Sequence, residues 1–269
     1  MTYEQARIIM ERAGLGETPI IDVHCHIGGY GRHVIPDGGS ARLLVGMMDR
    51  LGINVSLISH LAALTGEAFI GNRLIAEACA QYPGRIYGYL VYNPNTPQEE
   101  IAEEVESLIG HPGIVGLKFH STLHRAHPDN KMYAPAYELA MRHKLPILMH
   151  IWGAEDVNAL DAVCGEYPEI TVIAGHAGGS EWSDVAAACE VAKRRKNLYL
   201  EPCVSVVREG QIEYMIEKCS ADKIVYGSDA SFFCPIAGYG RLLFARIQRE
   251  DKRKILFQNA KDIFSELIS

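Results

Sequence analysis

Eight short apolar segments recur along the chain, and each is followed by a segment whose apolar residues have helical spacing. The strand-length segments are rich in Val, Ile, Leu and Tyr and span residues 19–27, 53–60, 85–94, 113–120, 146–151, 170–176, 197–205 and 223–229. The segments with helical spacing span residues 41–51, 67–82, 97–109, 134–144, 154–167, 181–195, 209–219 and 237–247. The pattern predicts strict alternation of strand and helix, which is typical of a parallel α/β fold.

The spacing of the predicted strands favours a closed barrel over an open sheet. Their starts lie about 29 residues apart, and eight such units fill the ~250 residues usual for a (β/α)₈ barrel. A doubly wound open sheet is the alternative, but it typically has fewer strands and often a GxGxxG turn after the first strand, which is missing here. We therefore expect one α/β domain over residues 1–269, a TIM barrel with extra helices at residues 2–13 and 250–268.

Composition limits the range of partners. Charged residues make up 22% of the chain and the net charge is -7, so we expect a small-molecule substrate and no nucleic acid. The seven cysteines contain no CxxC pair, which favours a reducing, cytoplasmic setting without disulfides. The sequence has no apolar run of ~18 residues and no apolar secretory segment near Met1, so it predicts neither a membrane span nor a signal peptide.

Polar residues that end predicted strands carry the candidate chemistry. His24 and His26 lie two residues apart at the end of the first strand, so alternation places both side chains on one face. His150 ends the fifth predicted strand, His176 the sixth and Asp229 the eighth. The carboxyl ends of barrel strands form the functional face, so we expect these side chains to meet there. An isolated HxH pair is more often satisfied by backbone or water, but the other strand ends argue against that here.

A metal centre is the chemistry that these residue types favour. We expect one divalent ion bound by three imidazoles and one carboxylate, those of His24, His26, His150 and Asp229. This set suits Zn²⁺, with Fe, Mn, Co or Ni as alternatives. His176 and Asp229 are the predicted catalytic residues, because an imidazole or carboxylate beside a metal-activated water can take its proton. A structural role is the alternative for His176.

Motifs spread in order across nearly the whole chain resemble those of the amidohydrolase superfamily: IIDVHCHIG, GIVGLKFH, LPILMH, IAGHAGG, IVYGSD and ILFQNAKDIF. The resemblance is stronger to the branch that contains aminocarboxymuconate semialdehyde decarboxylase, resorcylate decarboxylases and related hydrolases. It implies a distorted (β/α)₈ barrel with one metal ion at its mouth, the same four ligands, and His176 as the catalytic histidine. It also makes a homodimer or homotetramer an expectation, but it does not fix the reaction.

Five further residues are predicted to contact the substrate: Lys118, His120, Arg125, Trp152 and Glu201. In binuclear members of the superfamily a carboxylated lysine that ends the fourth strand bridges two metal ions, so a second metal at Lys118 is the alternative to the single expected ion. Each residue has a plainer interpretation as a polar or packed residue of the mouth or, for Arg125, as part of a solvated surface loop.

Two reactions suit the predicted site. The leading prediction is hydrolysis of a C–N or C–O bond in a small carbonyl compound, such as an amide, lactam or lactone, through a metal-activated water. The alternative is non-oxidative decarboxylation of a small unsaturated or aromatic carboxylic acid. A barrel that binds metal or metabolite without turnover is a third interpretation, which the protonatable groups beside the ligands disfavour. The sequence does not name the substrate.

Overall fold

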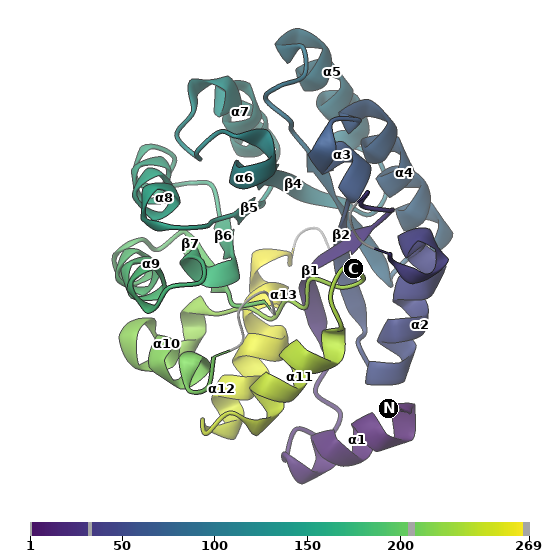
Figure 1. The fold of residues 1–269 in the computed structure, drawn as a ribbon, viewed down its shortest axis with the longest axis vertical. Helices are drawn as coiled ribbons and strands as arrows, with labels where there is room; N and C mark the ends of the chain where they lie inside the picture. Colours follow the sequence, from purple (N-terminus) through teal and green to yellow (C-terminus); the bar gives the residue numbers. More distant parts are fainter. Residues whose placement is uncertain (1, 32–33, 204–207, 266–269) are drawn as a thin grey trace.

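A parallel sheet forms the centre of the molecule in the computed structural model, which describes residues 2–31, 34–203 and 208–265 (Figure 1). Its seven strands lie in sequence order, and each pairs in parallel with the next. They are β1 (Ile21–Ile27), β2 (Val55–His60), β3 (Ile86–Val91), β4 (Ile114–His120), β5 (Ile147–His150), β6 (Val172–Gly175) and β7 (Leu198–Glu201). The seventh is shorter than the predicted segment 197–205, whose last two residues lie outside the described residues.

The eighth predicted segment closes the barrel without forming a regular strand. An isolated bridge joins its Ile224 to Leu200 of β7, and another joins Ala230, the residue directly after the segment, to Cys25 of β1. Between these bridges the Asp229 N–H donates to the His24 carbonyl over 2.7 Å. Asp229 has a φ of 58°, a left-handed conformation that interrupts an extended strand. The prediction of a regular strand over residues 223–229 is therefore wrong, whereas the distorted barrel is confirmed.

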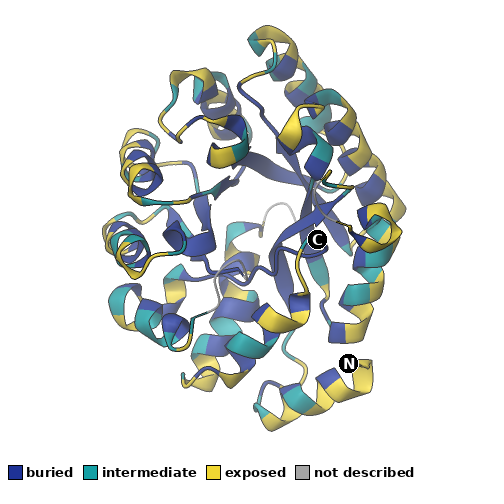
Figure 2. Cartoon of the chain, in the orientation of Figure 1, coloured by how far each residue is buried: buried dark blue, intermediate teal, exposed yellow. Residues whose placement is uncertain are grey.

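Helices surround the sheet, with their buried faces toward it and their exposed faces outward (Figure 2). The longer ones are α1 (Tyr3–Arg12), α2 (Ala41–Leu51), α4 (Ala68–Gln81), α5 (Gln98–Ile109), α7 (Ala134–His143), α8 (Ala154–Glu166), α9 (Trp182–Arg194), α10 (Gln211–Cys219) and α11 (Pro235–Phe244). Short helices α3 (Leu61–Thr65) and α6 (Ser121–His124) directly follow β2 and β4. Within the described residues, none of the helices has the length and apolar character needed to span a membrane.

The two predicted terminal helices are present. The first is α1, which begins with a capping box between Thr2 and Gln5. The second consists of α12 (Arg249–Arg253), a π-helical turn (Lys254–Gln258) and α13 (Asn259–Ile263). Residues 266–268 of that prediction lie outside the described residues.

Apolar side chains fill the barrel interior and leave the polar residues to the strand ends. One buried cluster combines a residue or two from most strands with the C-terminal helix: Ile21, Val23, Leu57, Tyr87, Tyr89, Val115, Leu148, Ile173, Val225, Ala260 and Phe264. A second, larger cluster joins the sheet to the helices. Parallel strands buried on both faces read as nearly continuous apolar runs, as these do. The polar residues at the carboxyl ends are therefore the exceptions that need a chemical explanation.

A close helix contact beside the mouth gives a stability prediction. A Cβ on Gly71 of α4 would lie 2.5 Å from the Ala63 Cβ and 2.6 Å from the Ala63 nitrogen in α3. We expect Gly71→Ala to lower the free energy of unfolding by about 1–3 kcal/mol, because the backbone of α3 must move. Gly46→Ala in α2 is the matched control, since a Cβ there meets nothing within 4 Å. Thermal unfolding should show a lower Tm for Gly71→Ala alone; equal Tm values would contradict the prediction.

Candidate active site

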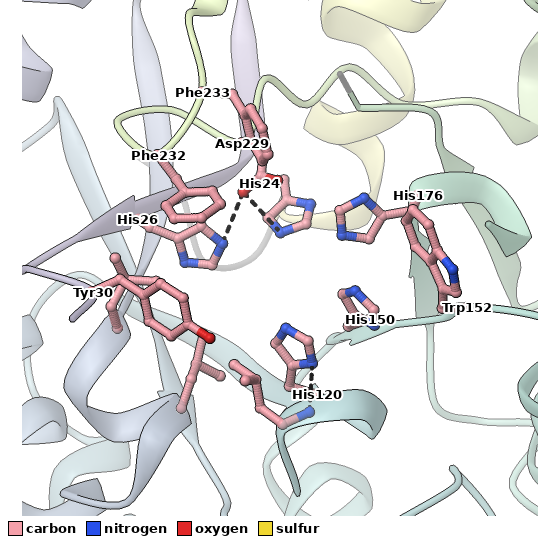
Figure 3. Close-up of a pocket in the computed structure, with 13 residues that line it drawn as sticks. His24, His26, Tyr30, His120, His150, Trp152, His176, Asp229, Phe232 and Phe233 are labelled. Carbon is pink, nitrogen blue, oxygen red and sulfur yellow. Dashed lines mark hydrogen bonds and ion pairs between the residues drawn. The ribbon is translucent and has the colours of Figure 1, made fainter. Parts of the chain in front are cut away.

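A cavity of about 390 Å³ lies at the carboxyl ends of the strands and contains every predicted metal ligand (Figure 3). Its walls combine imidazoles and one carboxylate with apolar and aromatic side chains: His24, His26, Tyr30, Leu61, Leu64, His120, Leu123, His150, Trp152, His176, Asp229, Phe232 and Phe233. The strand ends therefore bring together side chains that lie far apart in the sequence.

A β-bulge in β1 aims its two histidines at the cavity. The register of β1 on β2 shifts by one residue between Asp22 and Cys25. Simple alternation would place Val23 and His24 on opposite faces of the strand. Instead Val23 packs in the inner apolar cluster, while His24 and His26 line the cavity above it. The bulge thus lets one strand supply both the barrel core and the polar mouth, as bulges beside active sites commonly do.

Asp22 fastens the irregular eighth segment to β1. Its buried carboxylate accepts hydrogen bonds from the Ser228 N–H over 3.0 Å and from the His24 N–H over 3.2 Å. Burial raises the pKa of Asp22 to about 6, against the lowering effect of these hydrogen bonds. The carboxylate therefore positions both the strand that carries His24 and the segment that carries Asp229.

Three donor groups converge within reach of a single ion. Ligand atoms of His24, His26 and Asp229 all lie within 4.8 Å of one another. Asp229 Oδ1 lies 3.1 Å from His26 Nε2 and 3.9 Å from His24 Nε2. Burial opposes ionisation of Asp229, but its hydrogen bond to His26 and the neighbouring charges hold its pKa below the usual value. Two imidazoles and an ionised carboxylate fit a divalent transition-metal ion.

His24 has a polar partner on each ring nitrogen. Its Nδ1 lies 2.6 Å from Glu201 Oε2, and its Nε2 lies 3.0 Å from Lys118 Nζ. A lysine ammonium can only donate, so Nε2 is the acceptor and the Nδ1–H donates to Glu201. This tautomer places the lone pair of His24 on Nε2, which accepts from Lys118 and is the nitrogen nearer to Asp229. A histidine that binds a metal through Nε2 needs this arrangement.

Burial shifts the pKa values of His24, Lys118 and Glu201, in each case toward the neutral form of the side chain. It lowers the pKa of His24 well below the usual range and lowers that of Lys118 to about 8. Burial also raises the pKa of Glu201, and Asp229 adds to the rise, whereas the positive charge of Lys118 opposes it. Lys118 with a pKa of about 8 is mostly charged at pH 7, which keeps it a donor. Its contact with His24 therefore requires Glu201 to act as the acceptor.

Glu201→Gln tests this orienting contact. The variant keeps the size of the side chain and an oxygen that can accept the Nδ1–H of His24, but it replaces the carboxyl group by a less basic amide. We expect metal affinity to fall about 10- to 100-fold, the usual cost of changing such a partner. Competition with a chelator would measure the dissociation constant, and Glu106→Gln on the surface is the control. An unchanged metal affinity in Glu201→Gln would show that His24 does not depend on this bond.

His150 and His176 lie on the other side of the cavity. The His150 ring centroid is 4.5 Å from that of His176 and 3.8 Å from that of His120, on which it stacks. His150 Nδ1 is buried, and none of the residues that the structure describes forms a hydrogen bond with it. Among the described residues, His150 belongs to neither group of three ligand atoms within 4.8 Å. Its role as a fourth metal ligand stays a prediction.

Cys203 contacts the predicted catalytic histidine, and the sequence analysis missed it. Its Sγ lies 2.9 Å from His176 Nδ1, and ligand atoms of His24, His176 and Cys203 form a second group within 4.8 Å. Burial lowers the pKa of His176 to about 4 despite the opposing charge of Asp229, so the imidazole is neutral at pH 7. Cys203 follows Glu201 by two residues, and the alternation that paired His24 with His26 could have identified it.

Two of the five predicted substrate contacts line the cavity and three do not. His120 and Trp152 line the cavity. Lys118 and Glu201 are fully buried behind it and bond to His24, so they do not form part of its lining. Arg125 is exposed at the end of α6, also outside the lining, which gives its predicted role no support.

An aromatic wall completes the cavity and was not predicted. Tyr30 and Phe232 pack edge to face with ring centroids 5.7 Å apart, and Phe233 packs against Phe232 at 4.7 Å. The available signal was their position, since Tyr30 follows β1 closely and both phenylalanines follow Asp229. The cavity is therefore polar on the strand side and apolar around its rim.

The curled parallel sheet and the histidine-rich cavity at its carboxyl end define a TIM-barrel enzyme, because active sites of this fold lie at that face. The chain belongs to the amidohydrolase family, whose sequence model matches residues 21–265. No protein with a curated description matches the chain.

Solved structures share the fold at low sequence identity. An uncharacterized TIM-barrel protein from Bordetella bronchiseptica is 20% identical with a TM-score of 0.74, covering 93% of this chain and 99% of its own. A 2,6-dihydroxybenzoate decarboxylase from Rhizobium is 16% identical with a TM-score of 0.71, covering 93% and 99%. A dihydroxybenzoic acid decarboxylase from Polaromonas sp. JS666, with bound manganese and 2-nitroresorcinol, is 18% identical with a TM-score of 0.72, covering 92% and 97%. These similarities confirm the barrel.

Proposed function

We propose that the protein is a metal-dependent, non-oxidative decarboxylase of a small aromatic or unsaturated monocarboxylic acid. The observation that carries the proposal is the contrast between the two sides of the cavity. Ligand atoms of His24, His26 and Asp229 converge on one side, and aromatic and aliphatic side chains enclose the remaining space. A planar acid fits between them with its carboxylate toward the polar side. The names of two solved barrels of similar fold, both decarboxylases of dihydroxybenzoic acids, agree with this choice.

We propose one divalent ion, zinc by the preference of the ligand set, with manganese as the alternative suggested by a similar structure. His24, His26 and Asp229 would hold it, joined by His150 if that ring turns toward them. When bound, the ion would bind the substrate carboxylate and a neighbouring oxygen and withdraw electron density from them. A second ion is not part of the proposal, because the other group of ligand atoms shares His24 with the first.

The apolar walls favour the carbon–carbon cleavage. Among the described lining residues there is no lysine or arginine, so no side-chain cation there stabilises the negative charge of a free carboxylate. Protonation at the ring carbon and release of neutral carbon dioxide remove that charge, which a poorly hydrated site favours. The carbon–carbon bond breaks, its electron pair stays on the ring carbon, and a proton replaces the lost group. The reaction needs no oxidant or reductant.

His176 and Asp229 are the proposed carriers of that proton. His176 lines the cavity, and its Nδ1 contacts Cys203 Sγ, which fixes the position of the ring at the edge of the substrate space. Asp229 stays ionised beside His26 and can take a proton from the substrate side or return one. The two residues thus flank the space that the reacting carbon would occupy.

Hydrolysis of an amide, lactam or lactone is the second candidate. It is favoured by the placement of His176, whose ring centroid lies 5.3 Å from that of His24, close enough to take a proton from a water between them. The apolar walls do not favour it, since hydrolysis needs a water at the reacting carbon. We therefore rank it below decarboxylation.

One experiment separates the two reactions. Protein loaded with Zn²⁺ or Mn²⁺ is incubated with hydroxybenzoic acids, small unsaturated acids, lactones and amides. We expect carbon dioxide release in proportion to loss of one or more acids, and none with Asp229→Ala. Ring opening or amide cleavage without carbon dioxide release would overturn the proposal in favour of hydrolysis. Bound metal with no turnover across the panel would overturn it in favour of a binding protein.

A further inference from the structure

His120 lies on the wall of the cavity that the metal ligands do not occupy. It is the last residue of β4, its register partner across the sheet is His150, and their rings stack at 3.8 Å with 15° between the planes. It lines the same cavity as His26 and Asp229 but belongs to neither group of convergent ligand atoms in the described chain. Its side chain therefore faces the substrate space without being part of the metal cluster.

A helix cap fixes which nitrogen of His120 carries the proton. His120 is the N-cap residue of α6, and its Nδ1 accepts the Leu123 N–H over 3.3 Å. A nitrogen that accepts a hydrogen bond has no proton, so the proton of the neutral ring is on Nε2. The cap thus makes Nε2–H a donor with a fixed direction.

The donor of His120 points into the cavity. Figure 3 shows the capped nitrogen turned toward the backbone and the other ring nitrogen turned toward the space between His120 and His24. No hydrogen bond joins that Nε2 to another of the described residues. The hydrogen bond from Leu123 holds the ring, so the direction of the N–H is set before a ligand enters. A preoriented donor costs little to order on binding.

We propose that His120 is a substrate-binding residue that donates its Nε2–H to an oxygen substituent of the acid. The inference rests on the proposed function and narrows its substrate class to aromatic monocarboxylates that carry a hydroxyl or other oxygen acceptor. The carboxylate lies toward His26 and Asp229, and the substituent reaches the opposite wall. With its proton on Nε2, His120 neither binds the metal through that atom nor acts as a base there.

Two substitutions separate the donor from the cap. In His120→Asn the side-chain oxygen can cap Leu123, as asparagine does at helix N-termini, but no group reaches the position of Nε2. In His120→Gln the side-chain amide places an N–H near that position and the cap is lost. Calorimetry with the metal-loaded proteins then measures dissociation constants for benzoate and for its 2-, 3- and 4-hydroxy derivatives.

We expect a hydroxyl group on the ligand to increase its affinity, and we expect this increase to depend on His120. At least one hydroxybenzoate should bind the wild-type protein about 3- to 10-fold more tightly than benzoate, the range for one hydrogen bond. His120→Asn should lose this gain, taken as the ratio of hydroxybenzoate to benzoate affinity in the same variant, while metal content stays unchanged, and His120→Gln should recover part of it. A gain that persists in His120→Asn, no gain in the wild type, or metal loss in His120→Asn would each overturn the assignment.

Binding and turnover are measured separately, so the two proposals can fail separately. A hydroxyl gain that depends on His120 without carbon dioxide release from any acid supports the binding role and contradicts decarboxylation. Carbon dioxide release with no such gain supports decarboxylation and contradicts the role of His120.

Discussion

Asp229→Ala is expected to leave the purified protein without a stoichiometric metal ion and without measurable turnover. Asp229 is the carboxylate among the three convergent ligand groups, it is 4% exposed, and it lies 3.1 Å from His26 Nε2. Loss of an outer partner of a metal ligand already costs about 10- to 100-fold in affinity, so loss of a ligand should cost more than about 100-fold. Elemental analysis after dialysis measures the number of ions per chain.

The matched control is Asp222→Ala, which removes a carboxylate at the surface where Asp222 pairs with Lys254. Circular dichroism must show that both variants remain folded, because Asp229 also donates a backbone hydrogen bond to β1. One ion per chain and normal turnover in folded Asp229→Ala would contradict the proposed metal centre. For the control Asp222→Ala, one ion per chain and normal turnover are the expected result.

The sequence predicts the parts of this site that follow from local periodicity. Alternation along one strand placed His24 and His26 on the same face, and the position of His150, His176 and Asp229 at strand ends placed them at one mouth. Both arguments use only the two-residue repeat of a strand and the parallel order of a barrel. The structure brings all five side chains to one cavity.

Features that depend on two distant segments could not be predicted. The bulge in β1 changes which residues face inward, and it arises from pairing with β2. The left-handed Asp229 is held by a backbone bond to β1, so the irregular eighth segment depends on a contact some two hundred residues away. The bond between Glu201 and His24 joins residues 177 positions apart, and no local pattern distinguishes Glu201 from a substrate contact.

Loops carry the parts of the site for which the sequence has the weakest signal. Arg125 follows β4 and is predicted to contact the substrate. In the structure a left-handed residue with a φ of 52° ends α6 there and Arg125 is exposed, so this contact stays a prediction without support from the fold. Tyr30 and Phe232 lie in connections whose path has no periodic signal, and yet they form the wall of the cavity. Strand ends are fixed by the sheet, whereas loop side chains are fixed by packing against one another.

His176→Ala should separate catalysis from metal binding. His176 lies beside the cluster, with its ring centroid 5.3 Å from that of His24, but it is absent from the group formed by His24, His26 and Asp229. We therefore expect metal content within the range of the wild type and a kcat lower by about 10²- to 10⁴-fold, the usual contribution of a positioned proton carrier. Elemental analysis and carbon dioxide release measure the two effects on one preparation.

Cys203→Ser is the companion variant, because a hydroxyl can replace the thiol that contacts His176 Nδ1. It should keep the metal and most of the rate, since it leaves the imidazole in place. Asp229→Ala and His176→Ala therefore have different expected effects. Asp229 is needed to hold the ion, and His176 is needed only for the reaction. If His176→Ala lost the ion while Asp229→Ala retained it, the roles of the two residues would have to be exchanged, and the proton path proposed for decarboxylation would no longer pass through His176.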